Sequence, residues 1–265
     1  IMSKIIGLIH YENGTVAEAA TSIVVNSLRG WRSLSDKAQL LKLYKKLTKV
    51  IVTNLSNPSR MDASIADLCT HFSRLHIPEF IECFLPSILT ATEKAIMSSS
   101  DEKRFELINM YCDVTECSEE ATLLASTEFL EYCVSMFEAI EPKLTEVQIS
   151  TMLNLFDAFT SELRAKIQPF ALRIIDKSIS LALGMNNNEY VNDASSILFA
   201  MISDLTTHCV EQVSCRIQDL YNLAKAYMAN ENIIEFEDLI SGIAVTVSNI
   251  CKMNKQLAQP LMIEL

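Results

Sequence analysis

Apolar residues recur along this chain with the spacing of one face of an α-helix. The clearest stripes are Ile65, Leu68, Phe72 and Leu75; Phe129, Cys133, Met136, Phe137 and Ile140; and Leu198, Met201, Ile202, Leu205 and Cys209. Strict alternation of apolar and polar residues, the signature of a β-strand, is not sustained anywhere. The pattern therefore predicts an all-α protein.

Residues that typically begin helices divide the chain further. Ser35-Asp36, Ser100-Asp101 and Ser118-Glu119-Glu120 have the chemistry of N-caps followed by an acidic or polar first turn. The predicted helices begin near residues 2, 15, 35, 60, 78, 101, 118, 143, 169, 190, 211 and 232. We expect Pro86 to kink a helix from within. We expect the run Gly184-Met185-Asn186-Asn187-Asn188 to form a turn.

Alternate helix starts recur at a nearly constant interval. The starts near residues 15, 60, 101, 143, 190 and 232 are 41 to 47 residues apart. Two helices in such a period are typical of HEAT and armadillo repeats. The sequence therefore predicts a single α-solenoid over residues 1–265, with about six stacked helix pairs that form a curved superhelix.

The composition agrees with helices and excludes other classes. Five Gly and six Pro in 265 residues are too few for the tight turns of a sandwich or barrel. An apolar share of 49% excludes a disordered chain. No apolar run approaches the roughly 20 residues that span a bilayer. Because Ile1 precedes the first Met, we expect a fragment of a longer array.

Eight cysteines are scattered along the chain without a CxxC pair. They are at positions 69, 83, 112, 117, 133, 209, 215 and 251. Most fall in apolar helical stripes, where a free thiol packs as a small hydrophobe. We therefore predict reduced core cysteines in a protein of the cytoplasm and nucleus.

Charge is unevenly distributed along the sequence. Residues 1–60 carry a net charge of +6 and the remainder −17, which gives −11 in total. An acidic surface repels nucleic-acid phosphates and attracts basic protein segments. General solubility explains the acidity equally well.

Two groups of acidic residues are candidate partner-binding sites. They are Asp101, Glu102, Glu106, Asp113, Glu116, Glu119 and Glu120, and Glu231, Glu235, Glu237 and Asp238. Either group would receive an Arg- or Lys-rich segment through charge-assisted hydrogen bonds. Acids at helix N-termini also stabilise the helix itself, so this structural role stays open.

Five lysines form a candidate basic patch. They are Lys37, Lys42, Lys45, Lys46 and Lys49, with Tyr44 among them. Lysine clusters neutralise phosphates, but a solvated helix face has the same composition. No array of aromatic residues for base stacking accompanies them. We therefore do not expect nucleic acid as a partner.

Motifs for catalysis are missing from the sequence. The scattered glycines form no phosphate-binding loop, and the histidines form no HExxH motif. His208-Cys209 with Cys215 is better explained as helix residues than as metal ligands, and Asp67 with His71 as an exposed i, i+4 pair. The sequence predicts a non-catalytic protein without metal, cofactor or small-molecule substrate.

Two segments resemble nuclear transport receptors. The run from Ile5 to Val25 is similar to a middle unit of the importin-β (karyopherin-β) superfamily. The segment from Asp62 to Phe84, with Ile65-Ala66-Asp67-Leu68-Cys69-Thr70-His71-Phe72, resembles the transportin-3/importin-13 branch. Phe105 to Cys112 and Glu128 to Tyr132 keep that branch's order of an apolar helix, a turn and an aromatic helix.

The resemblance, which covers residues 5–140, implies a receptor that carries protein cargo under control of the GTPase Ran. Ran would bind a region outside this segment. The alternative is a HEAT scaffold subunit of a chromosome-organising, RNA-processing or translation-control complex. Both expectations concern protein partners and involve no covalent step.

Overall fold

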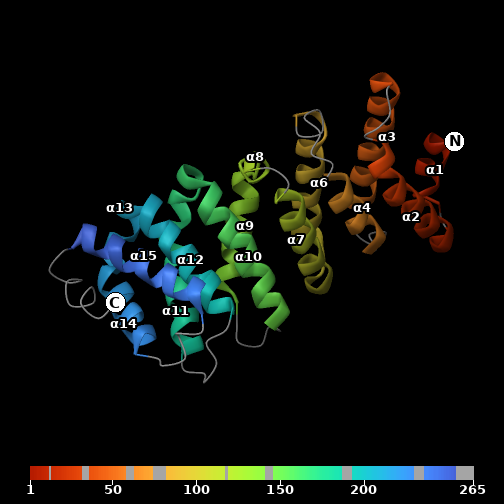
Figure 1. Cartoon of the computed structure of the whole chain (residues 1–265). Coiled ribbons are helices and arrows are strands. Elements are labelled where there is room, and N and C mark those ends of the chain that lie inside the picture. The colour runs from red at the N-terminus through yellow and green to blue at the C-terminus, as the bar shows by residue number, and fades with distance from the viewer. Residues whose placement is uncertain are drawn as a thin grey trace. The chain divides into compact units, whose positions relative to one another are not determined.

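The computed structural model describes residues 1–11, 13–31, 36–57, 63–73, 82–116, 119–140, 146–186, 193–229 and 236–254 (Figure 1). These residues form α-helices and short 3₁₀ helices, and no strand occurs among them. The prediction of an all-α chain is confirmed. The chain divides into two compact units, Ile1–Phe129 and Leu130–Leu265, which are described separately below.

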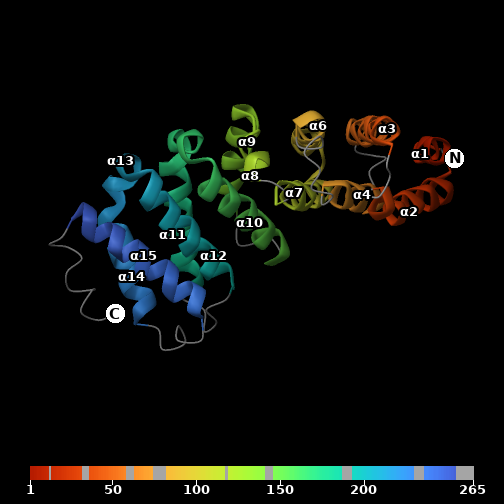
Figure 2. The ribbon, with the colours of Figure 1, turned by 45° about the horizontal axis from the view of Figure 1, so that its top comes forward.

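Unit 1 consists of helix pairs in two layers. The first layer holds α1 (Met2–Leu8), α3 (Lys37–Leu55) and α6 (Leu85–Ser98), and the second holds α2 (Gly14–Trp31), α4 (Ala63–Ser73) and α7 (Asp101–Thr115). Consecutive helices of a layer pack against each other, and Figure 2 shows the two rows. The short α8 (Glu119–Thr122) and the first turn of α9 (Thr127–Glu138) complete the unit.

Aromatic rings fill the space between the layers of unit 1. Tyr44 of α3 is buried, and its ring centroid lies 5.4 Å from that of Phe72 in α4 and 6.0 Å from that of Trp31 in α2. Each ring comes from the apolar stripe of its helix. The predicted stripe is confirmed for Ile65, Leu68 and Phe72, which are buried, while Leu75 lies outside the described residues. This packing turns the charged face of α3 toward solvent.

Unit 2 also packs its helices in two layers. One layer contains α10 (Glu146–Glu162), α12 (Asp193–His208) and α15 (Glu237–Met253), and the other contains α11 (Ala171–Asn186) and α14 (Ile217–Met228). The short helices η2 (Arg164–Lys166), η3 (Gln168–Phe170), α13 (Val210–Val213) and η4 (Ser214–Arg216) connect them. A close approach between α12 and α15 occurs at Gly242.

Hydrogen bonds between neighbouring helix pairs give an independent measure of the repeat. Several side-chain contacts among the described residues join positions 42 to 45 apart, and five of them serve as examples. They are Ser3–Lys46, Thr70–Asp113, Glu131–Arg173, Ala182–Tyr227 and Thr206–Asn249. This separation agrees with the predicted period of 41 to 47 residues in both units.

The helix predicted to start at Ser118 and to carry a stripe as far as Ile140 is interrupted between α8 and α9. Ser126 caps α9 by accepting a hydrogen bond from the Phe129 amide at 3.2 Å. The buried Glu93 carboxylate of α6 accepts hydrogen bonds from the Ser126 amide at 3.2 Å and hydroxyl at 2.7 Å. A carboxylate 33 residues earlier in the chain therefore stabilises the break.

Several other local predictions can be compared with the structure. Asp36 caps α3 as expected, with its carboxylate accepting from the Gln39 amide at 3.0 Å. Pro86 does not kink a helix, because it lies in the first turn of α6, where its missing N–H costs nothing. The predicted turn at Gly184 is also wrong, since α11 continues to Asn186. Asn187 and Asn188 lie outside the described residues.

The cysteines are reduced where they are described, but not all are in the core. Cys69, Cys133 and Cys209 are buried, and burial raises the pKa of the Cys69 thiol to about 12. Cys83 and Cys215 are exposed, so the core prediction is wrong for these two. Cys117 lies outside the described residues.

Candidate protein-binding surfaces

A row of exposed lysines follows one line of α3. Lys42, Lys45 and Lys49 are spaced by three and four residues, so their side chains leave the helix within about 60° around its axis. The same spacing continues through Val52 to Ser56 at the C-terminal end. α3 contains no acidic residue that would pair with these lysines.

The remaining two lysines of the predicted patch are placed differently. Lys37 is exposed in the first turn of α3, away from the row. Lys46 is half-buried and donates to the Ser3 carbonyl oxygen and, at 3.1 Å, to the Ser3 hydroxyl. Lys46 therefore joins α3 to α1 and serves packing. Only part of the predicted basic patch has freely accessible charge.

Charge is sorted between the two layers of unit 1. Helices α1, α3 and α6 together contain seven lysines and one acid, Glu93, which is buried against Ser126. Helices α2, α4 and α7 contain six acids and three basic residues. We call the exposed side of the first layer, with Lys42, Lys45, Lys49 and Lys94, the lysine face.

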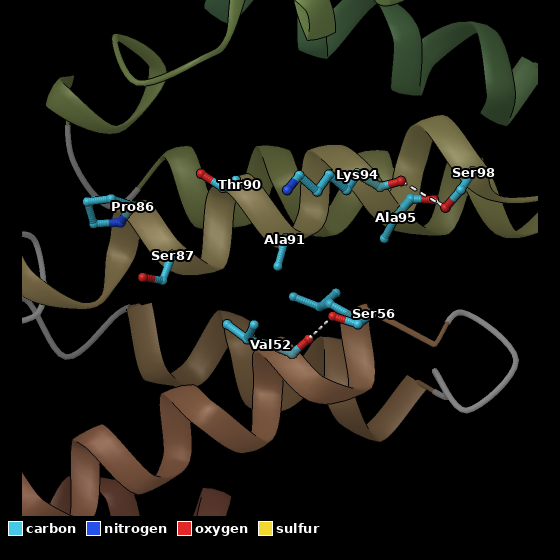
Figure 3. A pocket seen from close by; sticks show the side chains of 10 residues that line it. Val52, Ser56, Pro86, Ser87, Thr90, Ala91, Lys94, Ala95 and Ser98 are labelled. Atoms are coloured by element: carbon cyan, nitrogen blue, oxygen red, sulfur yellow. Dashed lines mark hydrogen bonds between the residues drawn. The ribbon is translucent and has the colours of Figure 1, made fainter.

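An open pocket of about 580 Å³ lies on the lysine face between α3 and α6. Its lining residues are Val52, Leu55 and Ser56 of α3, and Pro86, Ser87, Thr90, Ala91, Lys94, Ala95 and Ser98 of α6. Figure 3 shows Val52 and Ser56 pointing toward Ala91 and Ala95 across the gap. Small side chains such as Ser56, Ala91 and Ala95 leave room for the pocket between the two helices. The line of α3 lysines continues to Val52 and Ser56, which line the pocket.

The pocket combines an alkyl floor with hydroxyl groups and one cation. The Ser56 hydroxyl donates to the Val52 carbonyl at 2.8 Å, and the Ser98 hydroxyl donates to the Lys94 carbonyl at 2.8 Å. The oxygens of both hydroxyls keep lone pairs for an incoming N–H group. No Asp, Glu, His or Cys is among the lining residues, so the pocket offers no general base.

The first acidic group is largely occupied by contacts within unit 1. Asp101 pairs with Arg104 at 2.5 Å, and Glu106 pairs with Lys103 at 2.7 Å. Asp113 is half-buried and accepts from the Thr70 hydroxyl. Of this group, Glu116 is the exposed acid whose carboxylate has no hydrogen bond or ion pair to other described residues. The side chains of Glu102, Glu119 and Glu120 lie outside the described part.

The second acidic group is described only in part. Glu237 and Asp238 are exposed in the first turn of α15, where a carboxylate is favoured by the helix dipole. Glu231 and Glu235 lie outside the described residues. The two acidic groups belong to different units, and each is therefore a separate candidate surface.

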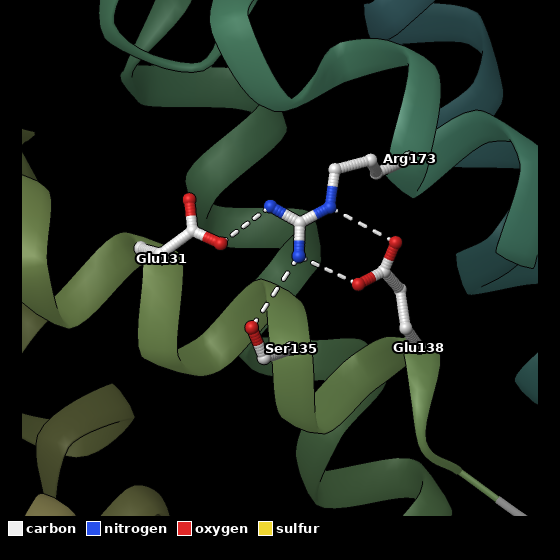
Figure 4. Close-up of polar contacts among 4 residues, drawn as sticks. All are labelled: Glu131, Ser135, Glu138 and Arg173. Carbon is white, nitrogen blue, oxygen red and sulfur yellow. Dashed lines mark hydrogen bonds and ion pairs between the residues drawn. The ribbon is translucent and has the colours of Figure 1, made fainter.

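Unit 2 contains a four-residue polar cluster that has a structural explanation (Figure 4). The Arg173 guanidinium of α11 binds the Glu138 carboxylate with two hydrogen bonds, of 2.9 and 2.6 Å, and the Glu131 carboxylate with one of 2.6 Å. Its contact to the Ser135 hydroxyl is 3.3 Å. These α9 residues share one helix face, so Arg173 ties α9 to α11. The same guanidinium lowers the pKa of Glu138 by hydrogen bonding.

A pair of partly buried carboxyls lies in α10 and α12. Burial raises the pKa of Asp157 to about 6, and the charge of Asp204 adds to this shift. The pKa of Asp204 is raised by burial and by Glu162, while His208 opposes the shift. Within the described residues, no three His, Cys, Asp or Glu side chains are arranged to hold a metal ion. Likewise, none of the described helices is both long and apolar enough to cross a bilayer.

The repeated helix pairs define an α-solenoid of the HEAT kind. No known family profile and no curated protein matches the sequence. The chain is similar to a crystal structure of importin beta, with a TM-score of 0.68 and 14% identity over 99% of this chain and 32% of that chain. It therefore spans about a third of the length of that importin beta chain.

Two engineered proteins of known crystal structure are also similar in fold. One has a TM-score of 0.65 and 10% identity, over 95% of this chain and 97% of its own. The other has a TM-score of 0.58 and 11% identity, over 94% of this chain and 68% of its own. At such identities the likenesses establish the solenoid fold, which is that of importin beta at the level of architecture.

Proposed function

We propose that this chain is a protein-binding segment of a nuclear transport receptor, in which Ran governs the release of protein cargo. The proposal includes membership of the transportin-3/importin-13 branch and movement between cytoplasm and nucleus. It is supported by the importin beta-like fold over 99% of the chain. Partners would bind without any covalent step, through buried area and charge pairing.

The observation that carries protein binding is the sorting of exposed charge in unit 1. A scaffold with a lysine face on one layer and acids on the other offers two surfaces that select partners by charge. We propose that the exposed acids Glu116, Glu237 and Asp238 receive basic segments of cargo. Each is free of ion pairs within the described residues, unlike Asp101 and Glu106.

The test uses the full-length receptor that this proposal implies, with Ran locked in its GTP form. Proteins bound to the immobilised receptor are quantified before and after addition of GTP-locked Ran, with GDP-bound Ran as the control. Release of bound proteins by GTP-locked Ran, but not by GDP-bound Ran, supports a transport receptor. A stoichiometric partner that stays bound in both states supports the alternative, a HEAT scaffold subunit, and contradicts control by Ran.

A further inference from the structure

We infer that the lysine face binds a short acidic segment of a partner protein, with one small apolar side chain of that segment seated in the α3–α6 pocket. This rests on the proposed protein-binding function and names the chemistry of one partner. The acidic groups are expected to bind basic partners, and the lysine face adds a second surface that binds an acidic partner.

The first argument is electrostatic. Lys42, Lys45 and Lys49 are spaced so that neighbouring ammonium groups repel each other along α3. No acid on α3 relieves this repulsion, and the single acid of α6, Glu93, is buried against Ser126. The ammonium groups of these three lysines have no ion pair or hydrogen bond to other described residues. A carboxylate-rich partner would neutralise them.

The second argument is geometric. The row from Lys42 to Ser56 is about 21 Å long, which matches roughly six residues of extended peptide. It ends at the pocket, where Val52, Ala91 and Ala95 provide an alkyl floor that fits a small apolar side chain. Lys94, on the opposite wall, adds a cation at this end.

The third argument concerns hydrogen bonding at the rim. The side chains of Ser87 and Thr90 are exposed at the pocket and make no hydrogen bond to other described residues. They are available to donate to peptide carbonyl groups. The Ser56 and Ser98 oxygens are available to accept from peptide amides, since their protons are directed to their own helix.

A protein segment fits this surface better than a nucleic acid does. The cations of the first layer are lysines, without the arginine fork that pairs with phosphate in a planar, bidentate way. Tyr44, the aromatic residue of α3, is buried and presents no ring for base stacking.

The experiment measures fluorescence anisotropy of a labelled peptide of alternating Glu and small apolar residues, Ala or Val, about twice as long as the lysine row. The comparison probes are the same peptide with Gln in place of Glu and a single-stranded oligonucleotide of equal net charge. The main variant is K49Q/K94Q, which removes the two charges nearest the pocket. The matched control is K225Q/K252Q, which removes two exposed lysines of unit 2.

We expect the acidic peptide to bind the wild-type chain, and to bind K49Q/K94Q about fivefold more weakly. The control variant should stay within about twofold of wild type. Ser87→Leu fills one end of the pocket without changing charge, and should weaken the acidic peptide by about threefold or more while leaving salt dependence unchanged. Circular dichroism and thermal unfolding establish that each variant is folded.

Three results would overturn the inference: tighter binding of the oligonucleotide than of the peptide, equal effects of K49Q/K94Q and its control, or no effect of Ser87→Leu. The first result would assign the face to phosphate chemistry. The proposed function fails on a different result, the absence of Ran-dependent release, so the two failures are distinguishable.

Discussion

At Gly242, α15 approaches the backbone of α12 more closely than any side chain permits. A Cβ atom at this position would lie 2.9 Å from the Phe199 Cβ and 3.2 Å from the Phe199 carbonyl carbon. Gly184 in α11 is the opposite case, because a Cβ atom there would meet nothing within 4 Å. The two glycines therefore have different physical roles in the same unit.

We predict that Gly242→Ala lowers the free energy of unfolding by about 1–3 kcal/mol, because the helices must separate to admit the methyl group. Gly184→Ala should raise it by up to about 1 kcal/mol, since alanine is the better helix former and no atom is displaced. Urea denaturation of both variants checks the pair. Equal effects at the two positions would contradict the close packing of α12 and α15.

The half-buried carboxyl of Asp157 makes stability depend on pH. In the unfolded chain it ionises near pH 3.8, but in the folded protein burial raises its pKa to about 6. The folded state therefore binds the proton more tightly. The stability that this provides is complete below pH 3.8 and is lost as pH rises through 6.

We predict that Asp157→Asn raises the free energy of unfolding by about 1 kcal/mol at pH 7, after allowance for the partial exposure of the side chain. At about pH 4 the difference should be close to zero. Denaturation at the two pH values provides the measurement. A stabilisation of the same size at both would show that charge at Asp157 is not the cause.

At the scale of helices, Arg173 is the clearest polar link between neighbours. It bonds Glu131, Ser135 and Glu138 on one face of α9. The side chains remain partly exposed, with 34% of Arg173 and 40% of Glu138 accessible to solvent, so screening limits the energy of the link.

We predict that Arg173→Gln lowers the free energy of unfolding by about 0.5–1 kcal/mol at low salt, and by less in about 1 M salt. Arg164→Gln is the control, because Arg164 is exposed and has no ion pair among the described residues. The carboxylate of Glu138 has a lowered pKa, so its contribution is present above pH 4.5 and is lost as pH falls. A salt-independent loss would contradict the electrostatic explanation.

Most helices could be predicted from the sequence because their stripes and caps are local signals. Asp36 and the stripe with Phe72 are examples. The break before α9 could not be predicted, because it depends on Glu93, 33 residues away. The prediction of a kink at Pro86 is wrong because it placed the start of the helix too early. The helix begins at Leu85, so Pro86 lies in the first turn and not in the interior.

Across the chain, the repeat of about 43 residues places charged residues that are distant in sequence on the same face of a layer. The lysines of α3 and Lys94 of α6 are far apart in sequence, and adjacent helices of one layer bring them to one face. The lysine cluster could be predicted from the sequence, but the pocket beside it requires that α3 and α6 pack together. The packing role of Lys46 likewise depends on α1.

The central claim is that this solenoid binds a protein partner through the lysine face. The most direct test is hydrogen exchange of the chain with and without saturating acidic peptide. We predict slower exchange of amides in residues 49–57 and in α6, with no change in α2, α4 or α15. Protection confined to α7 and α15, or no protection at all, would contradict the claim.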